Sequence, residues 1–378
     1  MKNIIITRKI QVYVNEPDKE LKKNFIHTIY QWRDLVRKGA NIIIAHKFTQ
    51  DNIREFVYLK DEIKEKFYVK DILQEKKGMS EQNTTYRILS DVMKGHVPAD
   101  IYSCLNQLIV NTYKETRKDL YTGKKSISSY KNNIPIPFSA KAVANIHWIE
   151  ESKKFNFVLF GIPFSVALGR DHSNNKVIIE RCIDDNNPYK ICSSSLQIDD
   201  KKKKMFLYLT ISFPQENVEL DKDKSIFARL DIETPIIAFI ENKQIKIGTK
   251  DEYLHRRLQI QGAIRRCQIN SKYNVGGKGR KRKMQKLDEW HNVEKNYINT
   301  KIHQYSRMLI DLAVKNRCGN LILKDTPRDN EIKENEFLLR NWTYYGLINK
   351  IKYKCAKYGV NLILHAQRVT PRDPYNVQ

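Results

Sequence analysis

Two short apolar segments in the C-terminal third of the sequence end beside charged residues, at positions where an enzyme could hold metal ions. The first, Ala228-Arg-Leu-Asp231-Ile-Glu, carries a carboxylate at Asp231, and the second, Asn320-Leu-Ile-Leu-Lys324-Asp325, carries an ammonium group at Lys324. Carboxylates on neighbouring strands can share the divalent cations that cleave phosphodiesters. An ammonium group cannot ligate a cation and repels one at close range. The two segments therefore predict a degenerate metal site, although a single Asp at a strand edge is more often a solvated residue.

Asp325 could supply the missing carboxylate only if the second strand changed its register. Side chains alternate along a strand, so Lys324 and Asp325 lie on opposite faces. A slip of one residue would bring Asp325 to the site, but it would also turn over the apolar residues of the strand. We expect Lys324 to form an ion pair with Asp231. Metal binding by Asp231 and Asp325 is the alternative.

The sequence is strongly basic, with 68 Lys and Arg against 43 Asp and Glu and a net charge of +25. Such an excess favours a phosphate-rich partner. The segment Gly276-Gly-Lys-Gly-Arg-Lys-Arg-Lys283 predicts a flexible turn leading into a cationic helix that contacts a phosphate backbone without sequence preference. A merely solvated face is the alternative. The predicted contacts in this region are Arg256, Arg257, Arg265, Arg266, Lys278, Arg280, Lys281, Arg282 and Lys283.

Further candidate contacts lie in Phe337-Leu-Leu-Arg340-Asn-Trp342-Thr-Tyr344-Tyr345, which opens a predicted helix. Arg340 could contact a phosphate. Trp342 or Tyr344 could stack on a base. Packing in the core is the more common role of such aromatic residues.

The first part of the chain predicts a strand, a helical region and then a small β-barrel. Residues 4–14 alternate as a strand, and residues 17–125 show helical spacing, with Gly39 as a possible helix end and one helical stretch over 51–77. The period then changes to two, and strands at this density favour a barrel that residues 4–14 complete. The later strands are expected at 134–139, 156–160, 163–168, 176–181 and 205–212.

From about residue 225 the order of elements changes to that of a ribonuclease-H-like α/β domain. A strand and a hairpin come first. They are followed by helices at 249–272 and 279–317, a strand at 320–324, a helix at 337–358 and a strand at 360–364. The fold class predicted is therefore α+β and multidomain. Its divisions are 1–16, 17–125, 126–222 and 223–378.

Cysteine usage and hydropathy limit the compartment and the cofactors. The six cysteines are scattered and form no Cys-x-x-Cys pair, which suits a reducing cytoplasm and offers no zinc-ligand spacing. No segment approaches the roughly 20 apolar residues of a membrane span, and no signal peptide is recognised. We expect a cytoplasmic, nucleoid-associated protein without a membrane partner.

Several motifs in one order resemble the RuvC-type domain of transposon-encoded TnpB proteins and of their miniature type V-F CRISPR relatives. The motifs are the Asp231 strand, GTKDEYLHRRLQIQGAIRRCQ, GGKGRKRKMQKLDEWHNVEKNYINTKIHQYSRMLIDLAVKNRCGNLIL and FLLRNWTYYGLINKIKYKCAKYGVNLIL. The resemblance covers about residues 225–375. The preceding helical insertion and barrel are similar in pattern to the recognition and wedge domains of that family.

The resemblance implies a protein that binds a guide RNA and pairs it with target double-stranded DNA beside a short flanking motif. Active members hold metals with three acids. The first corresponds to Asp231, and the second, normally Glu, corresponds to Lys324. The third follows a zinc ribbon of two Cys-x-x-Cys pairs, which family members enter near the position of Thr370. We therefore expect a truncated RuvC-like domain without the ribbon, catalytic magnesium or structural zinc.

These expectations lead to one preferred function and two alternatives. The preferred function is nuclease-inactive, RNA-guided DNA binding that regulates transcription. Activation would proceed through a recruited sigma factor and RNA polymerase, and repression through occupancy of a promoter. One alternative is an active RNA-guided DNA endonuclease with a degenerate metal site. The other is an RNA-binding accessory protein that does not engage DNA.

Overall fold

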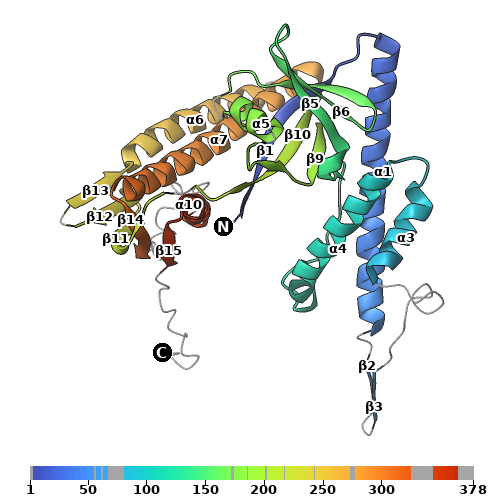
Figure 1. Ribbon diagram of the computed structural model, residues 1–378, viewed down its shortest axis with the longest axis horizontal. Helices are drawn as coiled ribbons and strands as arrows, with labels where there is room; N and C mark the ends of the chain where they lie inside the picture. Colours follow the sequence, from blue (N-terminus) through green and yellow to red (C-terminus); the bar gives the residue numbers. More distant parts are fainter. Residues whose placement is uncertain are drawn as a thin grey trace. The chain divides into compact units, whose positions relative to one another are not determined.

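The protein divides into two compact units, which we describe separately. One comprises Ile5–Pro214, and the other comprises Met1–Ile4 with Gln215–Gln378. The finer predicted division at residues 16, 125 and 222 stays a prediction. Figure 1 shows the elements of both units. The computed structural model describes residues 3–54, 57–60, 63–66, 81–171, 174–184, 186–200, 202–216, 218–241, 243–272, 277–324 and 344–364.

Helices α1 (Lys19–Arg54), α3 (Glu81–Met93) and α4 (Ala99–Tyr121) pack together in the Ile5–Pro214 unit. Helix α1 continues through Gly39, where the sequence suggested an end. A Cβ atom at Gly39 would lie 2.8 Å from Leu89 Cδ2 of α3. The glycine thus permits a close approach of two helices and does not terminate one.

Part of the stretch predicted as helical over 51–77 is instead a β-hairpin. Strand β2 (Val57–Lys60) pairs antiparallel with β3 (Ile63–Lys66). Val57, Tyr58 and Ile63 are residue types that favour strands over helices. The helical expectation was therefore wrong for these residues.

An eight-stranded sheet accompanies the helices, in the order β4-β9-β10-β1-β7-β6-β5 with β8 paired to β10. The strand predicted at 4–14 is confirmed as β1, between β10 and β7, so it joins strands that follow the helices in the chain. The strands are β1 (Asn3–Val14), β4 (Ile136–Phe138), β5 (Val143–Ile149), β6 (Lys154–Leu159), β7 (Ile162–Ala167), β8 (Lys190–Ile191), β9 (Ser194–Asp199) and β10 (Lys204–Pro214). A short 3-10 helix, Ala140–Ala142, separates β4 from β5.

This sheet is open, and the predicted closed β-barrel is wrong. Within the residues that the structure describes, the end strands β4 and β5 do not pair with each other. Strand β4 instead lies against helices α4 and α1. A helix that covers an edge strand protects the edge without closure of the sheet.

The segment 176–181, predicted as a strand, belongs to helix α5 (Asn175–Ile183). The Asp171 carboxylate accepts a hydrogen bond of 2.7 Å from the backbone N–H of Lys176 and so supports the first turn. Ile179 is buried, whereas Val177 is 43% exposed. The apolar run therefore does not reflect a strand with a buried face.

The second unit is built on a five-stranded sheet in the order β13-β12-β11-β14-β15. Strands β11, β14 and β15 run parallel, and β12 and β13 are antiparallel neighbours. The strands are β11 (Asp221–Arg229), β12 (Ile236–Ile240), β13 (Lys243–Ile247), β14 (Cys318–Lys324) and β15 (Asn361–Leu364). The predicted order of elements from residue 225 is confirmed for the described residues.

Helices α6 (Lys250–Lys272), α7 (Gly277–Lys315) and α10 (Tyr344–Tyr358) accompany this sheet, and α6 and α7 run side by side (Figure 1). Ala228 and Leu323 of the sheet are buried in one core with Leu309 of α7 and Leu347 of α10. Helices therefore cover that face of the sheet. None of the described helices has the length and hydropathy needed to span a membrane.

Candidate nucleic-acid interface

Asp231 lies just beyond the end of β11, at the carboxyl ends of the parallel strands. Its Oδ2 accepts a hydrogen bond of 2.8 Å from Arg229 Nη2. Its Oδ1 accepts a bond of 3.1 Å from the backbone N–H of Glu233, which closes the turn after the strand. The carboxylate is thus already held by a cation and an amide. Its side chain is 30% exposed, and that of Arg229 is 47% exposed.

Lys324 lies at the same edge of the sheet. Arg229 and Lys324 are directly paired in the parallel register of β11 and β14. Asp231 follows Arg229 by two residues, and the predicted ion pair between Lys324 and Asp231 stays a prediction. The ion pair that the structure describes for Asp231 is made by Arg229. The side chain of Lys324 and the whole of Asp325 lie outside the described residues.

A second carboxylate at this edge, Glu233, is also bound by a cation. Lys250 Nζ lies 2.5 Å from Glu233 Oε1, and the backbone N–H of Lys250 donates to the Glu233 carbonyl at 2.9 Å. Within the described part of the chain, no group of three or more His, Cys, Asp or Glu side chains is placed to hold a metal ion. A divalent cation at Asp231 would compete with Arg229 for the carboxylate and be repelled by it. Among the described residues, Asp231 and Glu233 are thus each paired with a basic side chain.

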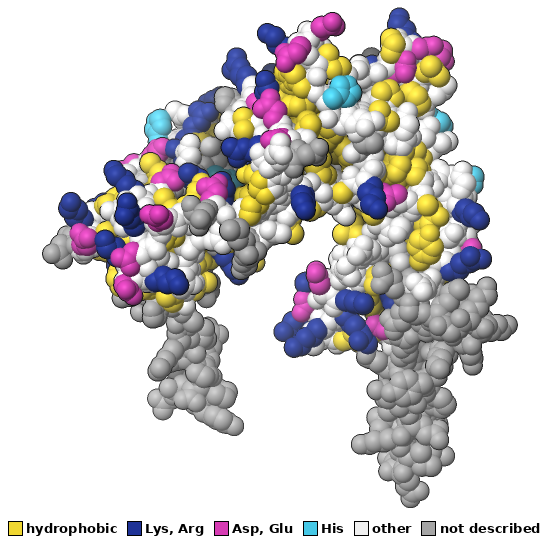
Figure 2. All heavy atoms as spheres, in the orientation of Figure 1, with side chains coloured by type: hydrophobic (Ala, Val, Ile, Leu, Met, Phe, Trp, Pro, Cys, Tyr) yellow, Lys and Arg dark blue, Asp and Glu magenta, His cyan; other side chains and the backbone are white. Residues whose placement is uncertain are grey.

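The arginines of α6 divide into buried and exposed groups. Arg257 was predicted to contact nucleic acid, but its side chain is 1% exposed and its Nε lies 3.0 Å from Glu294 Oε1 of α7. It joins the two helices and is not available at the surface. Arg256, Arg265 and Arg266 are exposed, and their role as contacts stays a prediction. On the face shown in Figure 2, Lys and Arg side chains are interspersed with Asp and Glu over the part of the molecule that carries α6 and α7.

The cationic run predicted to bind phosphate begins helix α7. The helix starts at Gly277, close to the predicted start at residue 279. Lys278, Arg280, Lys281, Arg282 and Lys283 are on its first turns, but their side chains lie outside the described residues. Their role as contacts stays a prediction. Arg340 and Trp342 also lie outside the described residues.

Tyr344 is a core residue, in contrast to its predicted role in base stacking. It is 9% exposed, and its hydroxyl donates to the Asp231 carbonyl at 3.3 Å. The neighbouring Tyr345 is 76% exposed and was not chosen from the sequence. Two adjacent tyrosines point to different sides of a helix, and only the helical phase of α10 shows which one is buried.

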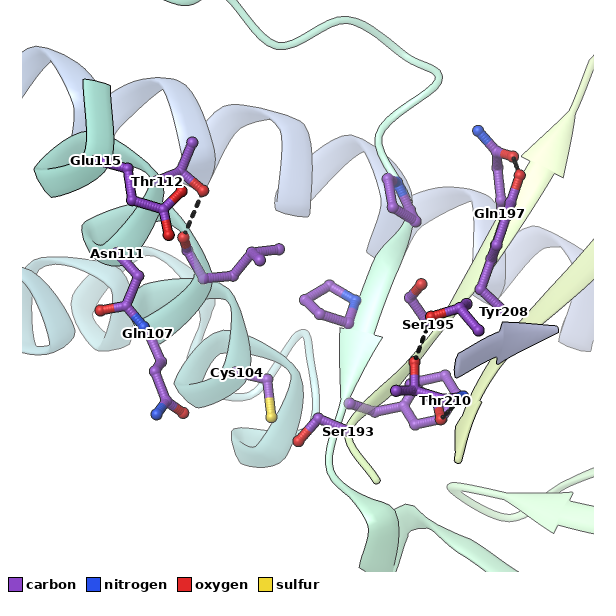
Figure 3. A pocket seen from close by; sticks show the side chains of 16 residues that line it. Cys104, Gln107, Asn111, Thr112, Glu115, Ser193, Ser195, Gln197, Tyr208 and Thr210 are labelled. Carbon is purple, nitrogen blue, oxygen red and sulfur yellow. Dashed lines mark hydrogen bonds between the residues drawn. The ribbon is translucent and has the colours of Figure 1, made fainter. Parts of the chain in front are cut away.

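A pocket of about 770 Å³ in the other unit was not foreseen from the sequence (Figure 3). Residues of α4, β1, β9 and β10 line it, and Tyr208 donates to Gln197 Oε1 at 2.6 Å on its sheet side. Burial, and then Asp100, raises the pKa of the lining thiol Cys104 to about 11, so the thiol is neutral at neutral pH. Side chains alternate along β10, which places Tyr208 and Thr210 on one face of the strand. This alternation is the sequence pattern that could have indicated the pocket.

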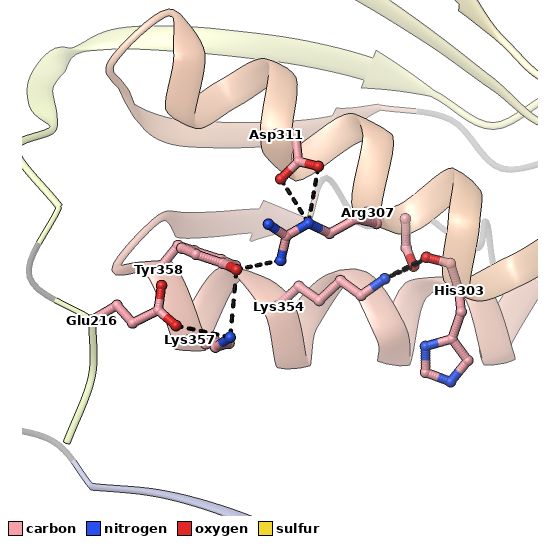
Figure 4. A network of polar contacts seen from close by, with 8 residues as sticks. Glu216, His303, Arg307, Asp311, Lys354, Lys357 and Tyr358 are labelled. Carbon is pink, nitrogen blue, oxygen red and sulfur yellow. Dashed lines mark hydrogen bonds and ion pairs between the residues drawn. The ribbon is translucent and has the colours of Figure 1, made fainter. Parts of the chain in front are cut away.

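A network of charged and polar groups joins α7 to α10 (Figure 4). Buried Lys354 donates from Nζ to Ser306 Oγ at 2.7 Å, and Arg307 pairs with Asp311 at 2.7 Å. Burial, and then the neighbouring Arg307, lowers the pKa of Lys354 to about 8. Each described cation of this network contacts a carboxylate, a carbonyl or a hydroxyl. The network therefore has a structural role, in the packing of α7 against α10.

Comparison with known proteins identifies relatives of one kind. No protein-family model matches the chain. A CRISPR-associated endodeoxyribonuclease Cas12f1 of Sulfoacidibacillus thermotolerans is 24% identical over 262 residues, which cover 66% of this chain and 62% of the relative. A second protein of that name, from Syntrophomonas palmitatica, is 28% identical over 215 residues, covering 53% of this chain and 41% of the relative. The chain thus spans less than two thirds of the length of these relatives.

The fold resembles a solved structure from the same group. The cryo-EM structure of a Cas12f1-sgRNA-target DNA complex aligns with a TM-score of 0.64 and 15% identity, over 95% of this chain and 88% of the Cas12f1 chain. At this identity the likeness establishes the α+β fold. The chain is therefore similar to Cas12f1 proteins both in sequence and in fold.

Proposed function

We propose that this relative of the type V-F proteins is a nuclease-inactive, RNA-guided DNA-binding protein that regulates transcription. The observation that carries the proposal is the pairing of Asp231 with Arg229, at a sheet edge where the opposite strand offers Lys324. Two-metal cleavage of a phosphodiester needs several carboxylates turned toward shared cations. Here each described carboxylate at the edge, Asp231 and Glu233, is bound by a basic side chain.

Guide RNA and target double-stranded DNA are the proposed partners. The net charge of +25 favours phosphate-rich ligands, and a Cas12f1 of similar fold was solved with sgRNA and target DNA. In such recognition, base pairing of the guide selects the sequence, and the protein contacts backbone and shape. A bound complex that does not cut could block RNA polymerase, or it could recruit polymerase through a sigma factor.

The test uses the full chain purified with its RNA. Sequencing that RNA identifies the guide, and a matched duplex is then assayed for a footprint and for cleavage with magnesium. We expect a guide-dependent footprint without cleavage of either strand. A duplex with a shuffled target is the control. The position of the target relative to a promoter separates activation from repression.

The Asp231→Ala variant distinguishes the alternatives. If the site is vestigial, the variant forms the same footprint as the wild type. Magnesium-dependent cleavage that is lost in Asp231→Ala would instead establish an active nuclease. Bound RNA without any guide-dependent footprint would establish an RNA-binding accessory protein.

A further inference from the structure

One face of the five-stranded sheet carries a row of apolar side chains outside the core. The register pairs Phe239 of β12 with Phe227 of β11, Phe227 with Ile322 of β14, and Ile322 with Ile363 of β15. Directly opposite residues share one face of a sheet. Each of the four alternates with residues of the core that α7 and α10 cover, so the row lies on the opposite face. We call Phe239, Phe227, Ile322 and Ile363 the apolar row.

The apolar row is accessible to solvent. Phe227 and Phe239 are each 37% exposed, Ile363 is 38% exposed, and Ile322 is half-buried. Strands β11, β14 and β15 run parallel, and parallel strands are normally covered by other structure on both faces of their sheet. A contiguous exposed apolar patch is typical of a surface that binds another protein. The row therefore resembles a sheet face that a further layer is meant to cover.

Basic residues border the apolar row on the side of the carboxyl end of β11. Arg229 follows Phe227 by two residues and shares its face. Lys246 of β13 lies opposite Ile237, and Ile237 lies opposite Arg229, so both cations are on this face. Both are exposed, and Arg229 also pairs with Asp231. A partner that covers the row meets positive charge along one side, which acidic residues of the partner would complement.

Three other occupants fit this face less well. A second copy of the chain also carries a charge of +25, which opposes self-association. Residues 365–378, which follow β15, contain two arginines against one aspartate, so they bring no excess of acidic residues to the basic border. A nucleic-acid strand could contact the cations, but Ile322 and Ile363 offer its bases no ring for stacking.

We propose that the apolar row binds an amphipathic helix of a protein partner, with the apolar side of the helix on the row and acidic residues against Arg229 and Lys246. Four strands about 4.8 Å apart make the row about 14 Å wide, close to the 10–12 Å diameter of one helix with its side chains. Helices are also the elements that normally cover parallel strands. The inference does not rest on the proposed function, because it concerns a contact with protein and not with DNA.

The first experiment titrates the full chain with its RNA against three labelled synthetic peptides of about 18 residues, or five helical turns. The first peptide has leucines at helical spacing and glutamates beside them. The second has glutamine in place of glutamate, and the third is a scrambled form of the first. Fluorescence anisotropy should show the strongest binding for the glutamate peptide and the weakest for the scrambled one. Equal affinities for the glutamate and scrambled peptides would overturn the inference.

Substitutions in the apolar row test its contribution to peptide binding. In Phe239→Thr and in Ile363→Thr, we expect the affinity for the glutamate peptide to fall at least about tenfold. Threonine keeps a strand-forming side chain at both positions, and thermal melting of each variant checks the fold. Met308→Thr removes an exposed apolar side chain from α7 of the same unit and should bind as the wild type does. Wild-type affinity in both row variants would refute the site.

Charge reversal tests the basic border. Lys246→Glu should weaken binding of the glutamate peptide several-fold and change binding of the glutamine peptide little. Lys243→Glu is the matched control, because Lys243 is exposed on the same strand and three residues away, on the other face. Equal effects of the two reversals on the glutamate peptide would mean that net charge, and not the position of Lys246, determines the affinity, and would overturn the assigned orientation.

A cross-link and two competing outcomes locate the helix. A benzophenone on the apolar side of the glutamate peptide should cross-link to β12 or β15 of the wild type, as mapped by mass spectrometry. Cross-links confined to the Ile5–Pro214 unit would overturn the inference. So would displacement of the peptide by an oligothymidylate, which would make the row a nucleic-acid site. Sedimentation of the wild type as a dimer and of Phe239→Thr as a monomer would assign the row to a second copy and equally overturn it.

Discussion

Lys354 is a buried cation whose protonation should couple to stability. Its pKa is lowered from the ordinary value of 10.5 to about 8, by burial first and by Arg307 second. The folded protein therefore loses this proton at lower pH than the unfolded chain. Stability should rise with pH between these two values, because in that window only the unfolded state holds the proton. The hydrogen bond to Ser306 orients the amine in either form.

Comparison with Lys354→Met tests this coupling. Between pH 7.5 and 10, we expect the free energy of unfolding of the wild type to increase relative to that of Lys354→Met by on the order of 2–3 kcal/mol. Urea denaturation at several pH values measures it. The exposed Lys352→Met on the same helix serves as control and should follow the wild type. Parallel pH profiles of wild type and Lys354→Met would contradict the assignment.

Arg257 and Glu294 form an ion pair that is almost completely buried between α6 and α7. Arg257→Ala leaves the Glu294 carboxylate without that cation in a water-poor site, and such single removals cost about 3–5 kcal/mol. The double variant Arg257→Met/Glu294→Leu removes both charges and should recover most of the loss. Urea denaturation measures each free energy of unfolding. Arg265→Ala, on the exposed side of α6, should change it by less than about 0.5 kcal/mol.

At the scale of elements, the long periodic segments were predictable and the local exceptions were not. The β1 strand, the paired long helices and the order of the C-terminal strands follow from period-two and helical spacing. The end of α1 was misplaced at Gly39, because a close contact with Leu89 of α3 cannot be read from one helix. The closed barrel failed for the same reason. Whether an edge strand meets another strand or a helix depends on long-range packing.

The candidate site was predictable in position and only partly in its contacts. The strand register pairs Lys324 with Arg229, two residues before Asp231. The actual partner of Asp231, Arg229, is two positions earlier in the same segment, because the strand ends there and the chain turns back. Burial of Arg257 and Tyr344 could not be foreseen, since both depend on which helix face meets its neighbour.

A pair of glycines tests the packing of the second unit. At Gly319 in β14, a Cβ would lie 2.4 Å from the Asp221 backbone oxygen, so the two strands would have to move apart. We expect Gly319→Ala to destabilise the protein by about 2 kcal/mol or more. At Gly262 in α6, the nearest atom to a Cβ is Arg266 Nη1 at 3.6 Å. Gly262→Ala should stabilise by about 0.5–1 kcal/mol, through helix propensity. Thermal melting of both variants compares the two sites, and equal shifts would refute the close strand contact.

At the scale of the whole molecule, the net charge of +25 predicts binding that weakens steeply with salt. The question is whether the cationic start of α7 contributes contacts or only a solvated face. Each phosphate contact releases counterions, so every lost contact lowers the slope of log K against log salt by about 0.7–0.9. A solvated face releases none on binding, and its removal changes the slope little. The slope therefore separates contact from background charge better than affinity alone.

The final prediction applies this measure to α7. A variant with Lys278, Arg280, Lys281, Arg282 and Lys283 changed to Gln should bind the co-purified RNA more weakly, with a slope reduced by about 0.7–0.9 per contact that is lost. Fluorescence anisotropy with labelled RNA measures both quantities. The matched control changes five exposed lysines of the same unit, Lys222, Lys224, Lys243, Lys315 and Lys352, and removes the same total charge. Equal slopes in the two variants would mean that the start of α7 is a solvated face, because the effect would then follow net charge and not position.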